Sequence, residues 1–131
     1  MTFASDVAKF ASKVNTRMDV VVRKITFDLT SSIVLKTPVD TGLARSNWQV
    51  GIGSRPSGTQ ATLDKSGQSS ITEAGQVTAS LKAGGVCYIV NNLPYIMALE
   101  FGHSKQAAAG MARISVARFQ AIADVAVRSV Q

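Results

Sequence analysis

The residues of this sequence that could do chemistry are few and stand far apart. Cys87 is the only cysteine and His103 the only histidine, whereas common zinc sites need several such ligands. The two could form a nucleophile and its base, but no third group that would orient the base is signalled. We expect Cys87, inside an apolar run, to be a small buried hydrophobe rather than a reactive thiol. His103, just past a predicted helix, is expected to be solvated or to bond the last carbonyls of that helix.

Two other stretches contain residue types that are found in active sites. Asp40 lies between Pro38 and Gly42, a composition typical of a turn that an aspartate closes and a glycine completes at positive φ. A catalytic carboxylate is the alternative, but no second acid or histidine is near, so the turn is favoured. Lys65-Ser66-Gly67 has the order of a phosphate-binding loop reversed, and we reject that interpretation. We therefore expect no catalytic residue, no cofactor and no metal site.

Glu100 is the acid whose position conflicts most with a local rule. It falls in the last turn of a short helix predicted over 95–101, where the helix dipole disfavours a carboxylate. Such a conflict indicates a partner, for which Arg113, Arg45 or a charge on another chain are candidates. A solvated surface glutamate is the alternative, and the sequence leaves both open.

The charge balance is basic, with 14 Lys and Arg against 8 Asp and Glu in 131 residues, a net charge of +6. This favours a polyanion or an acidic protein surface as a neighbour. Arg45, Arg55 and Lys65 motivate the alternative of a nucleic-acid-binding module, although no cluster of basic residues is visible along the chain. No apolar run is long enough to cross a membrane, and we expect no secretory signal at the start.

The elements that must position these side chains are clearest between residues 86 and 113. An apolar run over 86–90 predicts a buried strand, and Pro94 then introduces the short helix, which Gly102 ends. A polar loop over 103–106 follows. The helix predicted over 111–130 carries apolar residues on a wide arc, which predicts contacts on two sides.

Earlier in the chain, residues 47–52 alternate as a strand with Trp48 as a core anchor. Residues 53–69 are rich in Gly and Ser and predict a long mobile loop. Ser70 and Glu73 form a capping box for a helix to about residue 82. The elements predict one α+β domain over residues 1–131, with a long N-terminal helix, a small antiparallel sheet with the mobile loop, two short helices and a C-terminal helix.

The N-terminal helix, over about 4–36, is long for so small a domain, at about 45 Å. Asp19–Arg23 and Lys24–Asp28 have the spacing of ion pairs along it. Its apolar stripe, with spacings of three and four, consists of Val7, Ala11, Val14, Met18, Val21, Ile25 and Leu29. A core helix with a frayed start and an oligomer contact are both compatible with this length. This helix and the loop at about 53–69 are the expected assembly elements.

Four segments of the chain together resemble one family of tailed-bacteriophage neck proteins, the tail-completion or head–tail joining proteins, which are related to the minor tail proteins of long-tailed phages. In sequence order they are Thr-Pro-Val-Asp-Thr-Gly-Leu-Ala-Arg-Ser-Asn-Trp (37–48), Tyr-Ile-Val-Asn-Asn-Leu-Pro-Tyr-Ile (88–96), Leu-Glu-Phe-Gly-His-Ser-Lys-Gln-Ala (99–107) and Gly-Met-Ala-Arg (110–113). Their order and spacing match the family over most of the chain beyond residue 36. One position departs, because Ala108 stands where such proteins often have a proline.

The resemblance implies a non-enzymatic structural protein of the virion, which works in the phage neck and is assembled in the host cytoplasm. It would complete the tail and join it to the head as an oligomeric ring, with a tail-tube or tail-terminator protein, the head connector protein and DNA in the passage as partners. Its positive charge suits a ring around DNA. The candidate contacts to partners or sister subunits are Arg45, Arg55, Lys65, Glu100, His103, Lys105 and Arg113.

Overall fold

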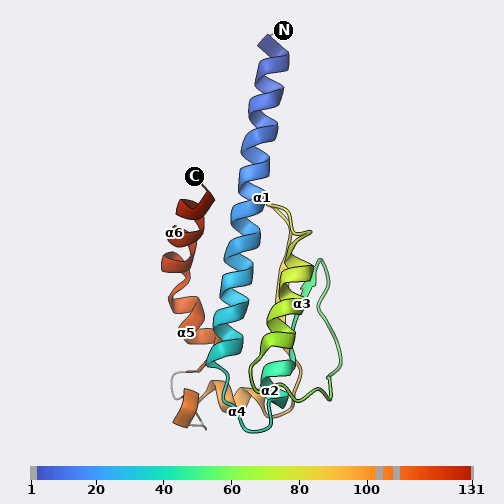
Figure 1. The fold of residues 1–131 in the computed structure, drawn as a ribbon, viewed down its shortest axis with the longest axis vertical. Helices are drawn as coiled ribbons and strands as arrows, with labels where there is room; N and C mark the ends of the chain where they lie inside the picture. The colour runs from blue at the N-terminus through green and yellow to red at the C-terminus, as the bar shows by residue number, and fades with distance from the viewer. Residues whose placement is uncertain (1–2, 103–104, 108–109, 131) are drawn as a thin grey trace.

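The computed structural model describes residues 3–102, 105–107 and 110–130, and its mixed α and β composition confirms the predicted fold class. Figure 1 shows one long helix with the other elements grouped around its lower half. In chain order the elements are α1 (Phe3–Lys36), α2 (Leu43–Ser46), β1 (Trp48–Ile52), α3 (Gln68–Thr78), β2 (Cys87–Asn91), α4 (Ile96–Glu100), the 3₁₀ turn Lys105–Ala107, α5 (Ala112–Ala117) and α6 (Phe119–Val130).

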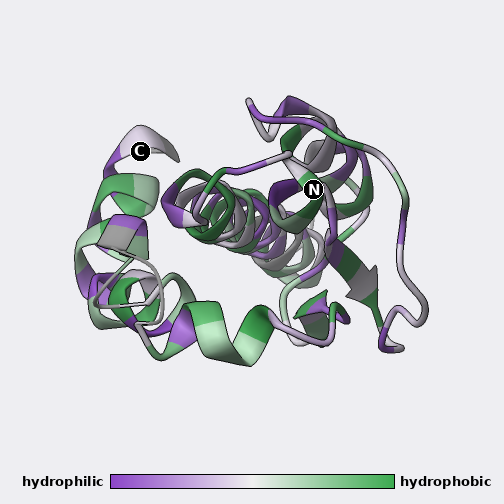
Figure 2. Cartoon of the chain, turned by 90° about the horizontal axis from the view of Figure 1, so that it is seen from below, coloured by the Kyte–Doolittle hydropathy of each residue, from purple (hydrophilic) through white to green (hydrophobic). Residues whose placement is uncertain are grey.

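Helix α1 is the axis of the body, as the view along it in Figure 2 shows. It contacts α3 on one side and α5 and α6 on the other. Two polar side chains fasten it to the turn after α3: Asp19 Oδ1 accepts the Ala83 N–H at 2.8 Å, and Arg23 Nε donates to the Leu81 carbonyl at 2.6 Å. The predicted Asp19–Arg23 ion pair was therefore wrong, because each side chain has a tertiary partner. The Lys24–Asp28 pair is confirmed at 3.0 Å.

The sheet consists of β1 and β2, paired antiparallel with Trp48 opposite Asn91 and Ile52 opposite Cys87. The predicted alternation is confirmed for Trp48 and Val50, which are buried, but not for Ile52 at the end of the strand, which is exposed. Trp48 is also confirmed as a core anchor: its indole Nε1 donates to Thr37 Oγ1 at 2.8 Å. The main core cluster comprises Ile33, Val34, Ala44, Trp48, Leu93, Ile96, Ala107 and Met111.

The predicted C-terminal helix is divided into α5 and α6 at Arg118. The Arg118 N–H bonds to the Ser115 carbonyl at 3.1 Å, a tight turn that interrupts the α-helical ladder. Ser115 is fully buried, and its hydroxyl bonds Ser32 of α1 at 2.9 Å. This anchoring is tertiary, so the apolar periodicity of the segment did not reveal it.

Helix α3 begins before the predicted capping box and ends at Thr78 rather than near residue 82. Ser70 lies inside the helix, and its hydroxyl donates to the Arg45 carbonyl at 2.8 Å. Asp64 caps the helix instead, with Oδ2 accepting the Ser69 N–H at 2.7 Å and Oδ1 accepting the Ser66 N–H at 3.0 Å. The capping-box prediction was wrong because the real cap lies six residues before Ser70.

The segment between β1 and α3 is tied to the body by side chains that flank it. The Asn47 amide donates to the Gln60 carbonyl at 2.9 Å and accepts the Gln60 N–H at 2.7 Å. Asn92 donates to the Gly58 carbonyl at 2.9 Å. These bonds hold Gly58 and Gln60, in the middle of a segment that has no strand or helix of its own, against the domain.

Gly42 takes the positive φ that the turn before α2 requires, at +90°. A Cβ at this position would overlap the backbone of Asp64 and Lys65. The local side-chain bond in the turn comes from Thr41, whose Oγ1 accepts the Leu43 N–H at 3.3 Å, and not from Asp40 as predicted. The turn is therefore confirmed, with a different residue closing it.

Candidate functional site

Glu100 and Arg113 are brought together at the start of α5. Arg113 Nε lies 2.9 Å from Glu100 Oε2, and Arg113 Nη2 also donates to the Glu100 carbonyl. The Glu100 carboxylate accepts the backbone N–H groups of Met111 at 3.2 Å, Ala112 at 2.8 Å and Arg113 at 3.2 Å. Of the partners that the sequence left open, Arg113 is confirmed. The C-terminal end of α4 disfavours the Glu100 carboxylate. The same carboxylate caps the N-terminal end of α5, where the helix dipole favours a negative charge.

The electrostatics of this cap follow from its donors. Burial raises the pKa of Glu100, but the Ala112 N–H, the Arg113 guanidinium and the N–H groups of Arg113 and Met111 outweigh it, so the pKa lies below its ordinary value. The Arg113 guanidinium also lies over the Phe101 ring, 4.7 Å from its centroid. The arrangement ties the end of α4 to the start of α5.

Arg45 lies apart from Glu100 and holds three backbone segments together. Its guanidinium donates to the carbonyls of Thr37 at 2.9 Å, Leu35 at 2.9 Å and Lys65 at 3.0 Å. These carbonyls come from the end of α1, the following turn and the segment before α3. Arg45 and Lys65 are thus neighbours, and Arg45 acts mainly as a structural clamp.

Of the other basic candidates, Lys65 contacts Arg45 through its backbone carbonyl. Arg55 and Lys65 are exposed at opposite ends of the 53–67 segment. Neither Arg55 nor Lys65 forms an ion pair with an acidic side chain of the described residues. The side chain of Lys105 lies outside the described residues, as do His103 and Ala108.

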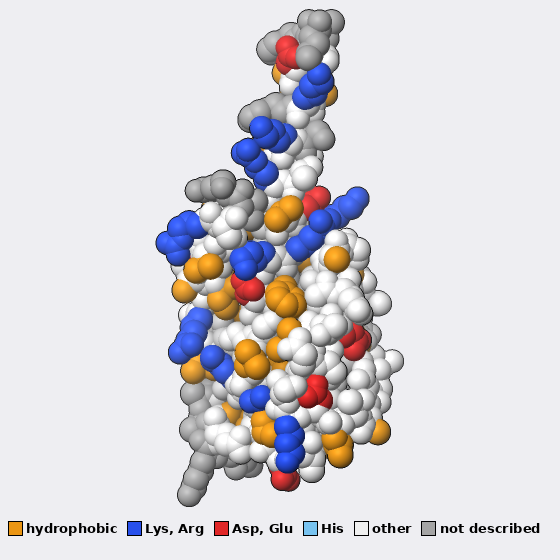
Figure 3. Space-filling view, in the orientation of Figure 1, with side chains coloured by type: hydrophobic (Ala, Val, Ile, Leu, Met, Phe, Trp, Pro, Cys, Tyr) orange, Lys and Arg blue, Asp and Glu red, His pale blue; other side chains and the backbone are white. Residues whose placement is uncertain are grey.

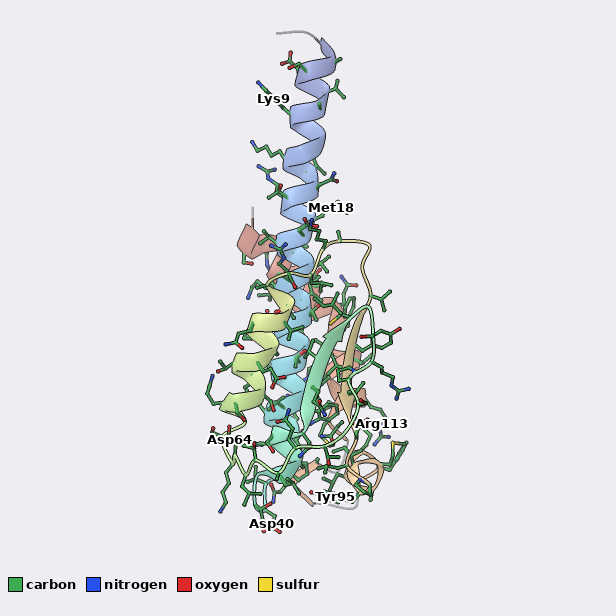
Figure 4. The ribbon with its side chains drawn as sticks, turned by 90° about the vertical axis from the view of Figure 1, so that its right-hand side faces the viewer. Lys9, Met18, Asp40, Asp64, Tyr95 and Arg113 are labelled. Carbon is green, nitrogen blue, oxygen red and sulfur yellow. The ribbon has the colours of Figure 1, made fainter. Side chains whose placement is uncertain are left out.

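A shallow groove of about 500 Å³ gathers basic residues that the sequence did not place together. Its lining includes Lys36 from the end of α1, Arg45 and Arg118 from the α5–α6 junction. Leu35 and Ile114 provide apolar wall. A second groove of about 260 Å³ lies at the opposite end of the molecule from the start of α1, and Asp40 and Tyr95 line its mouth (Figure 4).

Of the residues considered for catalysis, Asp40 and Cys87 lie among the described residues and His103 does not. Cys87 is partly buried in β2, and burial raises the pKa of its thiol, which lowers the thiolate fraction. Its pairing with His103 falls outside the described residues. No group of three or more His, Cys, Asp or Glu within the described ranges is arranged to hold a metal ion. Likewise, no described helix has both the length and the hydropathy to span a bilayer.

The exposed large apolar side chains include three groups on the helices, and others such as Leu35, Leu63 and Val86 lie outside these groups. The first is the projecting part of α1, where Val7 and Met18 are half exposed. The second is around α4, with Tyr95, Met97 and Phe101, and the third runs along α5 and α6, with Val116, Phe119, Val125 and Val127. Figure 3 shows hydrophobic patches along the visible face of the body and lysine and arginine side chains on the projecting helix.

The sequence missed Asp64 and the apolar surface around α4. Asp64 was assigned to a mobile loop, although its bonds to the N–H and hydroxyl of Ser66 and the N–H of Ser69 hold its pKa well below the usual range. Its position before Ser66 in the sequence was the signal that could have identified the cap. The α4 surface left no such signal, because Met97 and Phe101 belong to a run that also supplies core residues.

Compared with protein-family models, curated proteins and solved structures, the chain has no match in any of the three.

Proposed function

We propose that this chain is a structural, non-enzymatic protein of the phage neck, which completes the tail and joins it to the head connector as an oligomeric ring. It would act in the virion and assemble in the host cytoplasm. Its partners are sister subunits, a tail-tube or tail-terminator protein and the head connector protein. The proposal starts from the resemblance of four sequence segments and is supported by how those segments lie in the fold.

The observation that carries the proposal is that the four segments bond to one another as one unit at the lower end of the body. Gln106 accepts the Val39 N–H at 2.8 Å and donates to the Val39 carbonyl at 3.1 Å. Asn91 donates to the Ala44 carbonyl at 3.0 Å, and Glu100 binds Arg113. The residues that carry the resemblance therefore lie together in one folded unit, which supports the proposal.

The surfaces of the molecule support an assembly role. A subunit in a closed ring needs two different patches for its two neighbours, and a further patch for the tail or the connector. The apolar surfaces on α1, around α4 and along α5–α6 lie in different parts of the molecule (Figure 1). Their separation suits a subunit with several neighbours better than an enzyme with one site.

The test is assembly with isolated phage tails. The purified chain is mixed with tails that lack their neck, and free and bound protein are separated by sedimentation. A ring-sized increment of mass at one end of the tail, visible by electron microscopy, is the expected result. A chain that stays monomeric and ignores both tails and heads at tens of micromolar would contradict the proposal.

Contact with DNA is a second candidate function, and the groove lined by Lys36, Arg45 and Arg118 favours it. Cations along a groove neutralise phosphates and release counterions, so binding should weaken steeply with salt. Titration of a labelled duplex between low and physiological salt measures this slope. Substitution of Lys36 and Arg118 with glutamine should reduce the slope by about 1 for each phosphate that is no longer neutralised. An unchanged slope would exclude the groove as a DNA contact.

A further inference from the structure

Three cations line the groove of about 500 Å³ at the end of α1, which we call the basic groove. Lys36 is the last residue of α1, Arg118 follows the end of α5, and Arg45 comes from α2. Figure 1 shows α5 beside the lower end of α1, so two helix ends bring their cations to one place. No Asp or Glu is among the described residues that line this groove.

No carboxylate of the described residues neutralises these three cations. All eight Asp and Glu of the chain are among the residues whose side chains the structure describes, and none of them forms an ion pair with Lys36, Arg45 or Arg118. Glu100 lies behind the groove, but its carboxylate is occupied by Arg113 and three backbone N–H groups. Like charges that gather in one groove repel each other and attract an anion from outside.

The negative ends of α1 and α5 explain only part of this charge. A helix C-terminus carries about half a negative charge and favours a cation nearby. At α1 that cation is Arg45, which donates to the Leu35 carbonyl at 2.9 Å and to the Thr37 carbonyl at 2.9 Å. Lys36 is therefore a further cation beyond the one that the helix end binds. Bonds to three carbonyls also hold the Arg45 guanidinium in place, so its charge is positioned before a ligand arrives.

Part of the groove wall is apolar. Leu35 and Ile114 line it, and Leu35 is 53% exposed. A groove that combines cations with apolar side chains suits a protein segment that carries carboxylates and an apolar residue. A DNA duplex suits it less, since the phosphates lie along a convex surface, which meets the rim of a groove and leaves its apolar wall uncovered.

The sign of the charge argues against a second copy of this chain as the occupant. Each copy has a net charge of +6, so two copies repel each other. An acidic segment, in contrast, is attracted to the groove within a Debye length of about 10 Å. In the groove, its carboxylates would accept charge-assisted hydrogen bonds from the lysine and arginine side chains.

We propose that the basic groove docks an acidic segment of a partner protein, with carboxylates on Lys36, Arg45 and Arg118 and an apolar side chain against Leu35 and Ile114. The docking rests on the groove itself. That the partner is a tail or connector protein rests on the proposed function. Binding of DNA to the same groove is the competing outcome of the test.

Fluorescence anisotropy with a short labelled peptide of glutamate and leucine measures the docking on the full chain. The groove variant carries Lys36→Gln and Arg118→Gln, and it keeps Arg45 because this residue clamps the fold. The matched control carries Arg55→Gln and Lys82→Gln, at two exposed cations outside the groove, and has the same net charge. The peptide should bind the groove variant at least about tenfold more weakly than the parent, and the control less than about twofold more weakly.

Three further probes separate the carboxylates, the apolar wall and DNA. The peptide with glutamine in place of glutamate should not bind measurably, because it has no charge to offer. The peptide with serine in place of leucine should bind several-fold more weakly, because it leaves Leu35 and Ile114 uncovered. A labelled duplex should bind the groove variant and the matched control alike. A duplex that loses affinity in the groove variant alone, while the peptide does not, would overturn the proposal and assign the groove to DNA.

Equal weakening of the peptide in the groove variant and the control, or no binding to the parent at millimolar concentration, would also overturn the docking. The two proposals fail separately. A groove variant that joins tails and heads as well as the parent refutes docking of a tail or connector protein in the groove and leaves the neck assignment standing. A parent chain that binds the peptide through the groove but ignores tails and heads supports the docking and refutes the neck assignment.

Discussion

Replacing Glu100 tests whether this carboxylate holds the lower end of the body together. Glu100→Ala removes the acceptor for three backbone N–H groups of α5 and for Arg113. Loss of a helix cap costs about 1 kcal/mol. The Met111 N–H lies in the buried core and would lose its partner, which adds roughly 1–2 kcal/mol. The expected loss is about 2–3 kcal/mol of unfolding free energy.

The ion pair itself should contribute little of that loss. The Arg113 side chain is 51% exposed, against 12% for Glu100. Solvent screens such a pair to about 0–1 kcal/mol. Arg113→Ala is therefore expected to cost less than 1 kcal/mol, because the backbone bonds to Glu100 remain.

Denaturant unfolding followed by the fluorescence of Trp48, the only tryptophan, measures both effects. Glu73→Ala, at an exposed position of α3, is the matched control and should stay within about 0.5 kcal/mol of the parent. Either of two results would refute the capping role. One is a Glu100→Ala protein as stable as the control, and the other is an Arg113→Ala protein as destabilised as Glu100→Ala.

The pH dependence gives an independent check of the same carboxylate. Because the pKa of Glu100 is lower in the folded than in the unfolded chain, its stabilisation is complete above the ordinary glutamate pKa of about 4.3. It is lost as the pH falls through the folded-state pKa, since the unfolded state takes up the proton first. The stability difference between the parent and Glu100→Gln should therefore shrink below about pH 4. A difference that stays constant to lower pH would contradict this linkage.

Three further predictions concern the fold around the site. Gly42→Ala should destabilise the chain by about 2–4 kcal/mol, and the control Gly84→Ala by about 1 kcal/mol. Both glycines have positive φ, but only at Gly42 would an added Cβ overlap the backbone of another segment. Equal losses of stability in thermal unfolding would contradict this close approach. Thr37→Val leaves the buried Trp48 indole N–H without its acceptor and should cost about 1–3 kcal/mol in denaturant unfolding; an unchanged midpoint would show that the bond is dispensable. Asp64→Ala should speed amide hydrogen exchange at Ser66 and Ser69, with Asp40→Ala as a control that leaves both amides protected; equal exchange in the two variants would exclude the cap.

Local patterns in the sequence predicted most of the fold. Three of these patterns are the apolar periodicity of α1, the alternation around Trp48 and the glycine at position 42. Each acts within a few residues, so the element or turn that it produces could be predicted from the sequence. At the candidate site, the sequence showed only that Glu100 conflicts with the helix-dipole rule, which indicated a charged partner. Of the candidate partners, Arg113 is the one that the structure pairs with Glu100. The break at Arg118 could not be predicted from local pattern, and the bond that anchors the end of α5 there joins Ser32 and Ser115, which are 83 residues apart.

The misplaced cap of α3 has a related cause. Ser70 and Glu73 satisfied the capping-box pattern, but Ser70 is drawn to the Arg45 carbonyl, 25 residues away. Asp64, which takes over the cap, lay in a stretch dominated by glycine and serine. Tertiary hydrogen bonds of this kind override local propensity, and they decide where an element begins more than whether it exists.

The most direct test of assembly in the phage neck is the mass bound to neckless tails. The parent chain should sediment with these tails as a ring of fixed copy number, and the tails should then join to heads. A parent chain that remains free beside both tails and heads would contradict the central claim.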